Sequence, residues 1–153
     1  MLYIAHLFLP FRLDVKCSQH YELMLVFKHL PLSFHQNALI SAKYYEAISI
    51  QSPEKAFKFH SEVFKNQTKI KSGEAYLRTV AKKLDIDLVK LNQDIRSAAI
   101  TVKIDEDKKE AAKFNFQGTP GYLLNGIPIK GAYPASYFEE IITSLQNRGN
   151  LVL

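Results

Sequence analysis

Cys17 is the only cysteine in this chain of 153 residues, and its thiol is the side chain best suited to covalent chemistry. A single thiol can form a mixed disulfide, and His20 can assist it if the fold brings the two together. One cysteine excludes an internal disulfide framework and the usual cysteine-based zinc sites. The alternative, which the sequence favours, is an ordinary thiol in an irregular segment. In an exported protein a lone cysteine also allows an intermolecular disulfide.

The histidines are the other candidate bases or metal ligands. His29 and His35 flank Pro31, and His60 lies within a helical pattern. None of them has a second ligand at the spacing that a metal-binding helix requires, so we expect packing or capping roles and no metal site. The sequence contains no phosphate-binding loop and no nucleophile elbow. We therefore expect no cofactor.

Composition and charge describe an ordinary globular chain. Hydrophobic residues make up 47% and charged residues 23%, which excludes wholesale disorder, and the length predicts one domain. The formal net charge is +5, but acidic residues are interspersed with the lysines. A nucleic-acid-binding protein usually gathers its basic residues on one face, so solvated helix faces are favoured here and no nucleic-acid partner is expected. A nucleic-acid binder is the third functional alternative.

The first 22 residues are predicted to be an atypical N-terminal segment. Residues 1–11 are strongly apolar but too few to span a bilayer, which needs about 18 apolar residues. They lack the basic start and the small-residue cleavage site of a signal peptide. A buried strand ending at Pro10 is favoured over a targeting segment. Residues 23–28 form a second apolar run, which predicts a strand buried on both faces.

A block of helices is predicted after this strand. Ser33 and Gln36 match a capping box, Asp87 and Ser97 are suitable N-cap residues, and Asn115 suits the left-handed conformation that ends a helix. The expected helices cover residues 33–49, 53–66, 73–84, 87–95 and 97–114.

The pattern then changes to strands. Two apolar runs, residues 122–124 and 127–129, are separated by Asn125 and Gly126, the preferred pair for a type I′ hairpin turn. Pro128 cannot donate a ladder hydrogen bond, so its strand is expected at the edge of the sheet. A final amphipathic helix follows. The order of strand, helical block, hairpin and helix predicts an α/β fold in which helices pack on a small mixed sheet.

Two segments together resemble a known family. The first is the run VFKHLPL at residues 26–32, followed by an alanine-containing helix, and the second is Gly118-Thr119-Pro120 followed by the hairpin and the last helix. These features resemble the DsbA-like thioredoxin-fold proteins, which are thiol–disulfide oxidoreductases. The resemblance implies a DsbA-like thioredoxin domain over about residues 23–146, with a thioredoxin-like mixed sheet, a helical insertion at about 33–97 and a tail at 147–153.

The resemblance also implies a substrate-binding loop at Gly118, Thr119 and Pro120. In that family the Thr-Pro peptide bond is cis, and the loop backbone pairs with an extended peptide or an unfolded protein. The residues alone also allow a trans proline that only breaks the chain before a strand. By the same resemblance, the protein is expected to be periplasmic or otherwise extracytoplasmic.

This chain departs from the family at its catalytic motif. The family's chemistry needs Cys-x-x-Cys at the start of the helix after the first strand, where the helix N-terminus lowers the pKa of the leading thiol. Cys17 has no second cysteine and lies too close to residue 23 for a crossover helix to fit, so it takes no catalytic role from the family. The first strand and helix of the fold are therefore expected to be absent or replaced. A truncated gene, a mistaken start and a degenerate paralogue each explain this departure.

Two functional hypotheses follow. The first is a DsbA-like protein that is related to disulfide oxidoreductases but lacks dithiol redox activity, with its status as an enzyme left open. The alternative is a non-enzymatic peptide- or protein-binding module that uses the Thr119-Pro120 loop. No membrane span is expected. Residues 1–9 or a second copy of the chain can cover the apolar surface that a missing strand exposes, so a homodimer is one expectation.

Overall fold

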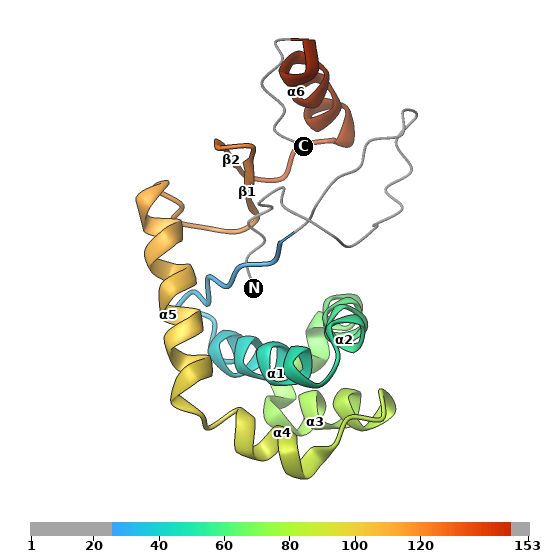
Figure 1. Ribbon diagram of the computed structural model, residues 1–153. Helices are drawn as coiled ribbons and strands as arrows, with labels where there is room; N and C mark the ends of the chain where they lie inside the picture. The colour runs from blue at the N-terminus through green and yellow to red at the C-terminus, as the bar shows by residue number, and fades with distance from the viewer. Residues whose placement is uncertain (1–25, 148–153) are drawn as a thin grey trace. The chain divides into compact units, whose positions relative to one another are not determined.

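The structure, a computed structural model, describes residues 26–147 (Figure 1). The described residues belong to two compact units, one of residues 29–110 and one that combines residues 26–28 with 111–147. The predictions for Cys17, for the N-terminal segment and for the tail from residue 148 lie outside the described residues. Among the helices that are described, none combines the length and the apolar character that crossing a membrane requires.

The first unit is built from helices. A fully buried core joins them, in which the rings of Tyr44 and Phe59 stack with centroids 6.2 Å apart and Ile48, Leu77 and Leu91 are also fully buried. The helices in chain order are α1 (Ala38–Gln51), α2 (Pro53–Lys65), the short 3-10 helix η1 (Gln67–Ser72), α3 (Glu74–Lys83), α4 (Leu88–Asp94) and α5 (Ala98–Lys113), whose last three residues belong to the second unit.

Two predicted N-caps are confirmed. The Asp87 carboxylate accepts hydrogen bonds from the amides of Val89 (2.8 Å) and Lys90 (3.1 Å) at the start of α4. The Ser97 hydroxyl oxygen accepts one from the amide of Ile100 (3.3 Å) at the start of α5. Each cap satisfies first-turn amides that have no partner within the helix.

The capping box predicted at Ser33 and Gln36 is wrong. Both residues are exposed and lie in the turns that precede α1, which begins at Ala38. Asn37 holds the N-cap position, and its side-chain amide donates to the carbonyl of Ile70 (2.8 Å) instead of capping the helix. This hydrogen bond anchors Asn37 to a segment distant in sequence, and the helix starts only after it.

The second unit contains the predicted hairpin. Strands β1 (Gly121–Leu124) and β2 (Ile127–Lys130) pair antiparallel, and helix α6 (Ala135–Asn147) follows. Asn125 and Gly126 have φ angles of 47° and 87°, as a type I′ turn requires. The hairpin prediction is therefore confirmed. A small apolar cluster joins the hairpin to α6: Leu124, Ile129 and Ile142 are buried, with Tyr122, Phe138 and Ile141 packed against them.

The described fold agrees with the coarser prediction of helices combined with a small sheet. The sheet that the described residues form has two strands, β1 and β2. Of the strand predicted at residues 23–28, only 26–28 are described: Val26 makes an isolated β-bridge, and the next residues form no strand. The larger mixed sheet and the replaced first strand and helix remain predictions.

Candidate functional site

The candidate site is the loop between α5 and β1, and it begins where α5 ends. Asn115 takes the predicted left-handed conformation (φ 55°). The Phe116 amide donates to the Ala111 carbonyl and the Asn115 amide to the Ala112 carbonyl, both at 2.9 Å. This pair of bonds is the Schellman arrangement, which satisfies the last helical carbonyls and turns the chain away from the helix.

Two contacts then position the far end of the loop. Phe116 is buried, and a Cβ atom built on Gly121 would lie only 2.7 Å from its ring, so a residue without a side chain is needed there. The Gly131 amide donates to the Pro120 carbonyl (2.9 Å), which joins the loop to the residue after β2. The loop is therefore held from both ends.

The three predicted site residues, which are consecutive in sequence, lie on this loop. Thr119 is exposed, and Gly118 and Pro120 are half-buried. The Thr119–Pro120 peptide bond is cis. No backbone hydrogen bond joins Gly118 or Thr119 to another residue of the described range 26–147. Their backbone N–H and C=O groups can therefore pair with a ligand.

A pocket of about 330 Å³ opens beside the loop. It is lined by residues 115–120 together with Lys130 and Gly131. Lys130 is exposed, and it is the charged residue among those that line the pocket. Lys130 was not predicted as a site residue, although the hairpin register, which places it opposite Gly121, could have located it once the turn was recognised.

His60 is a core residue, as the sequence predicts. Its ring stacks on Phe64 with centroids 4.4 Å apart and lies nearly perpendicular to the Tyr45 ring with centroids 6.3 Å apart. Burial disfavours the charged imidazolium and lowers the pKa of His60 to about 4. Burial likewise raises the pKa of Tyr45. Both side chains are neutral near neutral pH.

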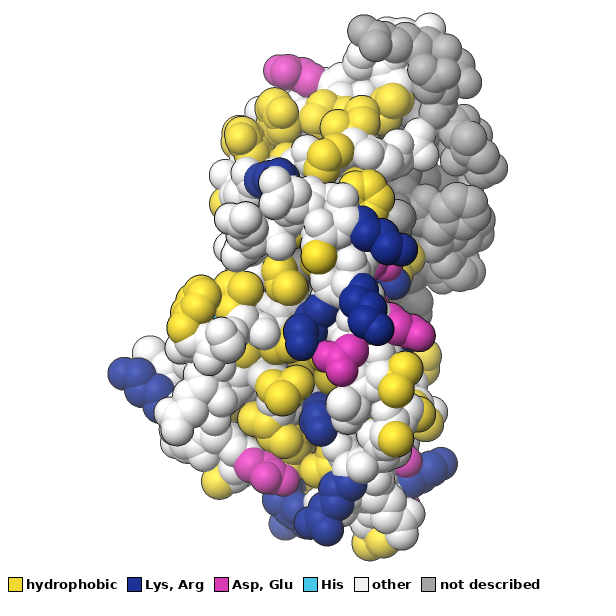
Figure 2. Space-filling model, turned by 90° about the vertical axis from the view of Figure 1, so that its left-hand side faces the viewer, with side chains coloured by type: hydrophobic (Ala, Val, Ile, Leu, Met, Phe, Trp, Pro, Cys, Tyr) yellow, Lys and Arg dark blue, Asp and Glu magenta, His cyan; other side chains and the backbone are white. Residues whose placement is uncertain are grey.

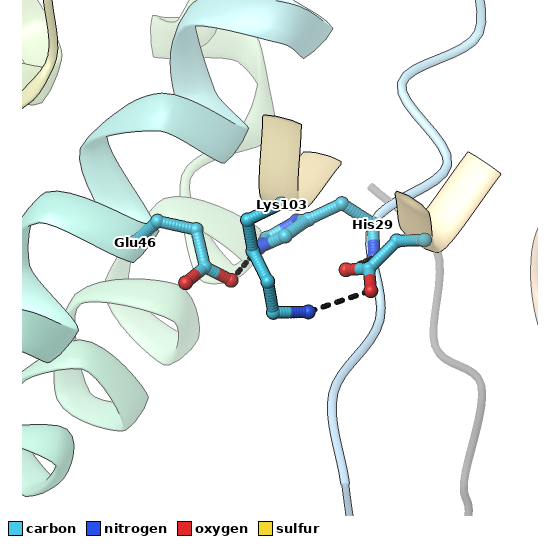
Figure 3. A network of polar contacts seen from close by, with 4 residues as sticks. His29, Glu46 and Lys103 are labelled. Carbon is cyan, nitrogen blue, oxygen red and sulfur yellow. Dashed lines mark hydrogen bonds and ion pairs between the residues drawn. The ribbon is translucent and has the colours of Figure 1, made fainter. Parts of the chain in front are cut away.

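A buried polar cluster in the first unit was not predicted (Figure 3). His29 Nε2 lies 2.9 Å from a Glu46 carboxylate oxygen, and the His29 backbone amide donates to the Asp107 carboxylate (2.9 Å). Lys103 donates to the other oxygen of the Asp107 carboxylate at 2.6 Å. One signal could have indicated Asp107, because it lies on the same helical face as the buried Ile104 and Ala111.

On the face shown in Figure 2, lysines and arginines lie among acidic and apolar side chains instead of forming one continuous patch. Lys108, for example, pairs with Asp105 at 3.0 Å on the exposed side of α5. This distribution agrees with the solvated helix faces that the sequence predicts.

Comparison with known proteins gives one family and several distant relatives. Residues 14–143 match the family model of the DSBA-like thioredoxin domain. A protein named Na⁺/H⁺ antiporter NhaA 1 from Mycolicibacterium vanbaalenii is 29% identical over 118 residues, which cover 75% of this chain and 18% of the relative. The protein of that name from Salinispora arenicola is 28% identical over 120 residues, which cover 78% of this chain and 18% of the relative. This chain therefore spans less than a fifth of the length of these relatives. No solved structure matches it.

Proposed function

The chain belongs to the DSBA-like thioredoxin domain family, and on that premise we propose that it is a peptide-binding member without dithiol redox activity. The observation that carries the proposal is the loop at Gly118 and Thr119, whose backbone groups have no hydrogen-bonding partner within the described range and which borders a pocket. Dithiol exchange needs a second thiol to resolve the mixed disulfide, and this chain has one cysteine.

The proposed ligand is an extended polypeptide segment. An added strand gains affinity from main-chain hydrogen bonds and specificity from a pocket that accepts a side chain. Gly118 and Thr119 offer the main-chain groups, and the neighbouring pocket offers the second element. Lys130 at the pocket favours a ligand with an acidic side chain at that position, because an opposite charge there gains Coulomb energy.

The test is the binding of a fluorescein-labelled, cysteine-free extended peptide with one central glutamate, measured by fluorescence anisotropy. Thr119→Arg places a long charged side chain over the exposed loop backbone, and we expect it to weaken binding at least tenfold. Ser144→Arg is the matched control, since Ser144 is exposed on α6, in the same unit. Cys17→Ser should leave the affinity unchanged, because the proposed contacts involve no thiol.

Two results contradict the proposal. Equal peptide affinity of Thr119→Arg and Ser144→Arg would show that the loop does not bind the peptide. Repeated turnover in reductant-driven insulin precipitation, abolished by Cys17→Ser, would show that the protein carries out thiol redox chemistry. The expected result in that assay is precipitation no faster than a single-thiol background.

Location and assembly are further parts of the proposal. An extracytoplasmic location is supported by membership of the DSBA-like thioredoxin domain family. A homodimer is also part of the proposal, in which a second copy of the chain covers apolar surface. Sedimentation of the full chain over a range of concentrations tests the dimer, and a monomer at every concentration would contradict it.

The relatives favour a second candidate function, a domain that works with a cation–proton antiporter. Proteins that carry the antiporter name match this chain over about 118 residues each, so the similarity concerns one region of much longer proteins. The DNA that flanks this reading frame tests the idea. Apolar segments of about 18 residues or more in frame, or an adjacent antiporter gene, are expected, and their absence on both sides would contradict it.

A further inference from the structure

The polar cluster in the first unit places three potential metal ligands together. His29 comes from the segment before α1 and Glu46 from α1, both labelled in Figure 3, and Asp107 comes from α5. One ligand atom from each residue lies within 4.8 Å of those from the other two. His29 and Asp107 are 1% and 0% exposed, and Glu46 is half-buried. Three separate segments of the chain therefore direct donor atoms to one interior point.

One nitrogen of the His29 ring takes part in no hydrogen bond with the described residues. Nδ1 is buried and has no hydrogen-bond partner among the described residues, while Nε2 faces Glu46 at 2.9 Å. In a tetrahedral site with zinc–ligand bonds of about 2.0 Å, two ligand atoms lie about 3.3 Å apart. The distance between Nε2 and the Glu46 oxygen is close to that value. A metal ion can therefore be held between Nε2 and the Glu46 carboxylate after a small movement of the two side chains.

Lys103 occupies the position of a cation beside Asp107. Its ammonium lies 2.6 Å from the buried carboxylate, but 42% of the Lys103 side chain is exposed. A long, partly exposed side chain can swing its charge into water without unfolding the helix. The Asp107 oxygen that accepts from Lys103 can then bind a metal instead. The ammonium and a metal ion are thus alternative partners of one carboxylate.

We propose that His29, Glu46 and Asp107 form a binding site for a divalent transition-metal ion, for which the Lys103 ammonium is a built-in competitor. One imidazole and two carboxylates suit Zn²⁺ or a similar ion, whereas Mg²⁺ prefers oxygen ligands and retains its waters. Water would complete the coordination. Because the ammonium competes for Asp107, the affinity of the unaltered protein for the metal ion is expected to be modest. Removal of the lysine is expected to raise that affinity.

Isothermal titration of Zn²⁺ into the chelator-stripped full chain tests the site. Lys103→Met keeps the side-chain stem and removes the competitor, so Zn²⁺ should bind at least tenfold more tightly than to the unaltered protein. Glu46→Gln retains the shape but weakens the ligand, and it should bind at least tenfold more weakly. Mg²⁺ should bind at least 100-fold more weakly than Zn²⁺ throughout. Circular dichroism checks that each variant is folded.

Two matched controls separate this site from adventitious zinc binding. Lys108→Met removes a lysine of the same helix that pairs with the exposed Asp105, and His35→Gln removes an exposed histidine. Neither should change the Zn²⁺ affinity. The proposal is overturned if Lys103→Met binds no more tightly than Lys108→Met, or if Glu46→Gln binds as the unaltered protein does. Should Lys103→Met fail to fold, the comparison of Glu46→Gln with His35→Gln decides alone.

Discussion

The buried His60 predicts a specific loss of stability in mild acid. Its pKa falls from 6.5 to about 4 on folding because burial disfavours the imidazolium. Between these two pH values the unfolded chain binds a proton that the folded chain does not, so the free energy of unfolding decreases as the pH decreases. Applied to the interval from pH 7.5 to pH 5.0, the two pKa values give a loss of about 2 kcal/mol from this one residue.

Urea denaturation at pH 7.5 and pH 5.0, followed by circular dichroism, measures this loss. Other groups also titrate in this interval, so the comparison is with His60→Leu, which fills the same place in the core with an apolar side chain that binds no proton. The unaltered protein should lose about 2 kcal/mol more than His60→Leu between the two pH values. His35→Gln, at an exposed histidine, should behave as the unaltered protein does. The same loss in all three proteins would refute the reasoning.

Two further predictions each test one contact, the first in the second unit and the next in the first unit. Gly121→Ala places a Cβ 2.7 Å from the buried Phe116 ring, and it should lower the free energy of unfolding, measured by urea denaturation, by about 1–3 kcal/mol. Gly118→Ala is the control, because its Cβ would meet no neighbouring atom within 4 Å, and it should change this free energy by less than about 0.5 kcal/mol. Equal losses would contradict the proposed clash. Tyr44→Phe removes the hydrogen bond to Glu74 (2.9 Å) and should lower the midpoint of thermal unfolding, by an amount that corresponds to about 1 kcal/mol; an unchanged midpoint would show that this bond contributes nothing.

Features that depend on neighbouring residues were predictable from the sequence. The Asp87 and Ser97 caps bond amides two or three residues ahead, so the residue type and its position before an apolar pattern were sufficient. Asn125 and Gly126 were equally clear, because both tolerate the positive φ that a type I′ turn requires. In each case the residues that decide the geometry are adjacent in sequence.

Features that join distant segments were not predictable. The Asn37 side chain donates to a carbonyl 33 residues away, and α1 begins at Ala38, after the place that the local capping pattern indicated. His29 meets Asp107 across 78 residues, so the apolar face of α5 could suggest that Asp107 is buried but could not name its partners. A single sequence contains no record of such pairs.

The candidate loop lies between these two cases. Gly118, Thr119 and Pro120 were selected through the family resemblance, since three such residues are common in loops and indicate no function by themselves. Lys130 and the pocket depend on the hairpin register and on the bond between Gly131 and Pro120.

Pro128 has a consequence for how the hairpin behaves in a crowded solution. Because the turn has two residues, Leu124 and Ile127 exchange backbone hydrogen bonds. The next pair, Leu123 and Pro128, does not exchange backbone hydrogen bonds, so the Pro128 nitrogen faces away from β1, toward the outer edge of β2. A strand that approached this edge would meet the proline ring at the position where pairing requires a backbone N–H donor. Within the described hairpin, this edge of β2 is therefore a poor template for pairing with a strand of another chain.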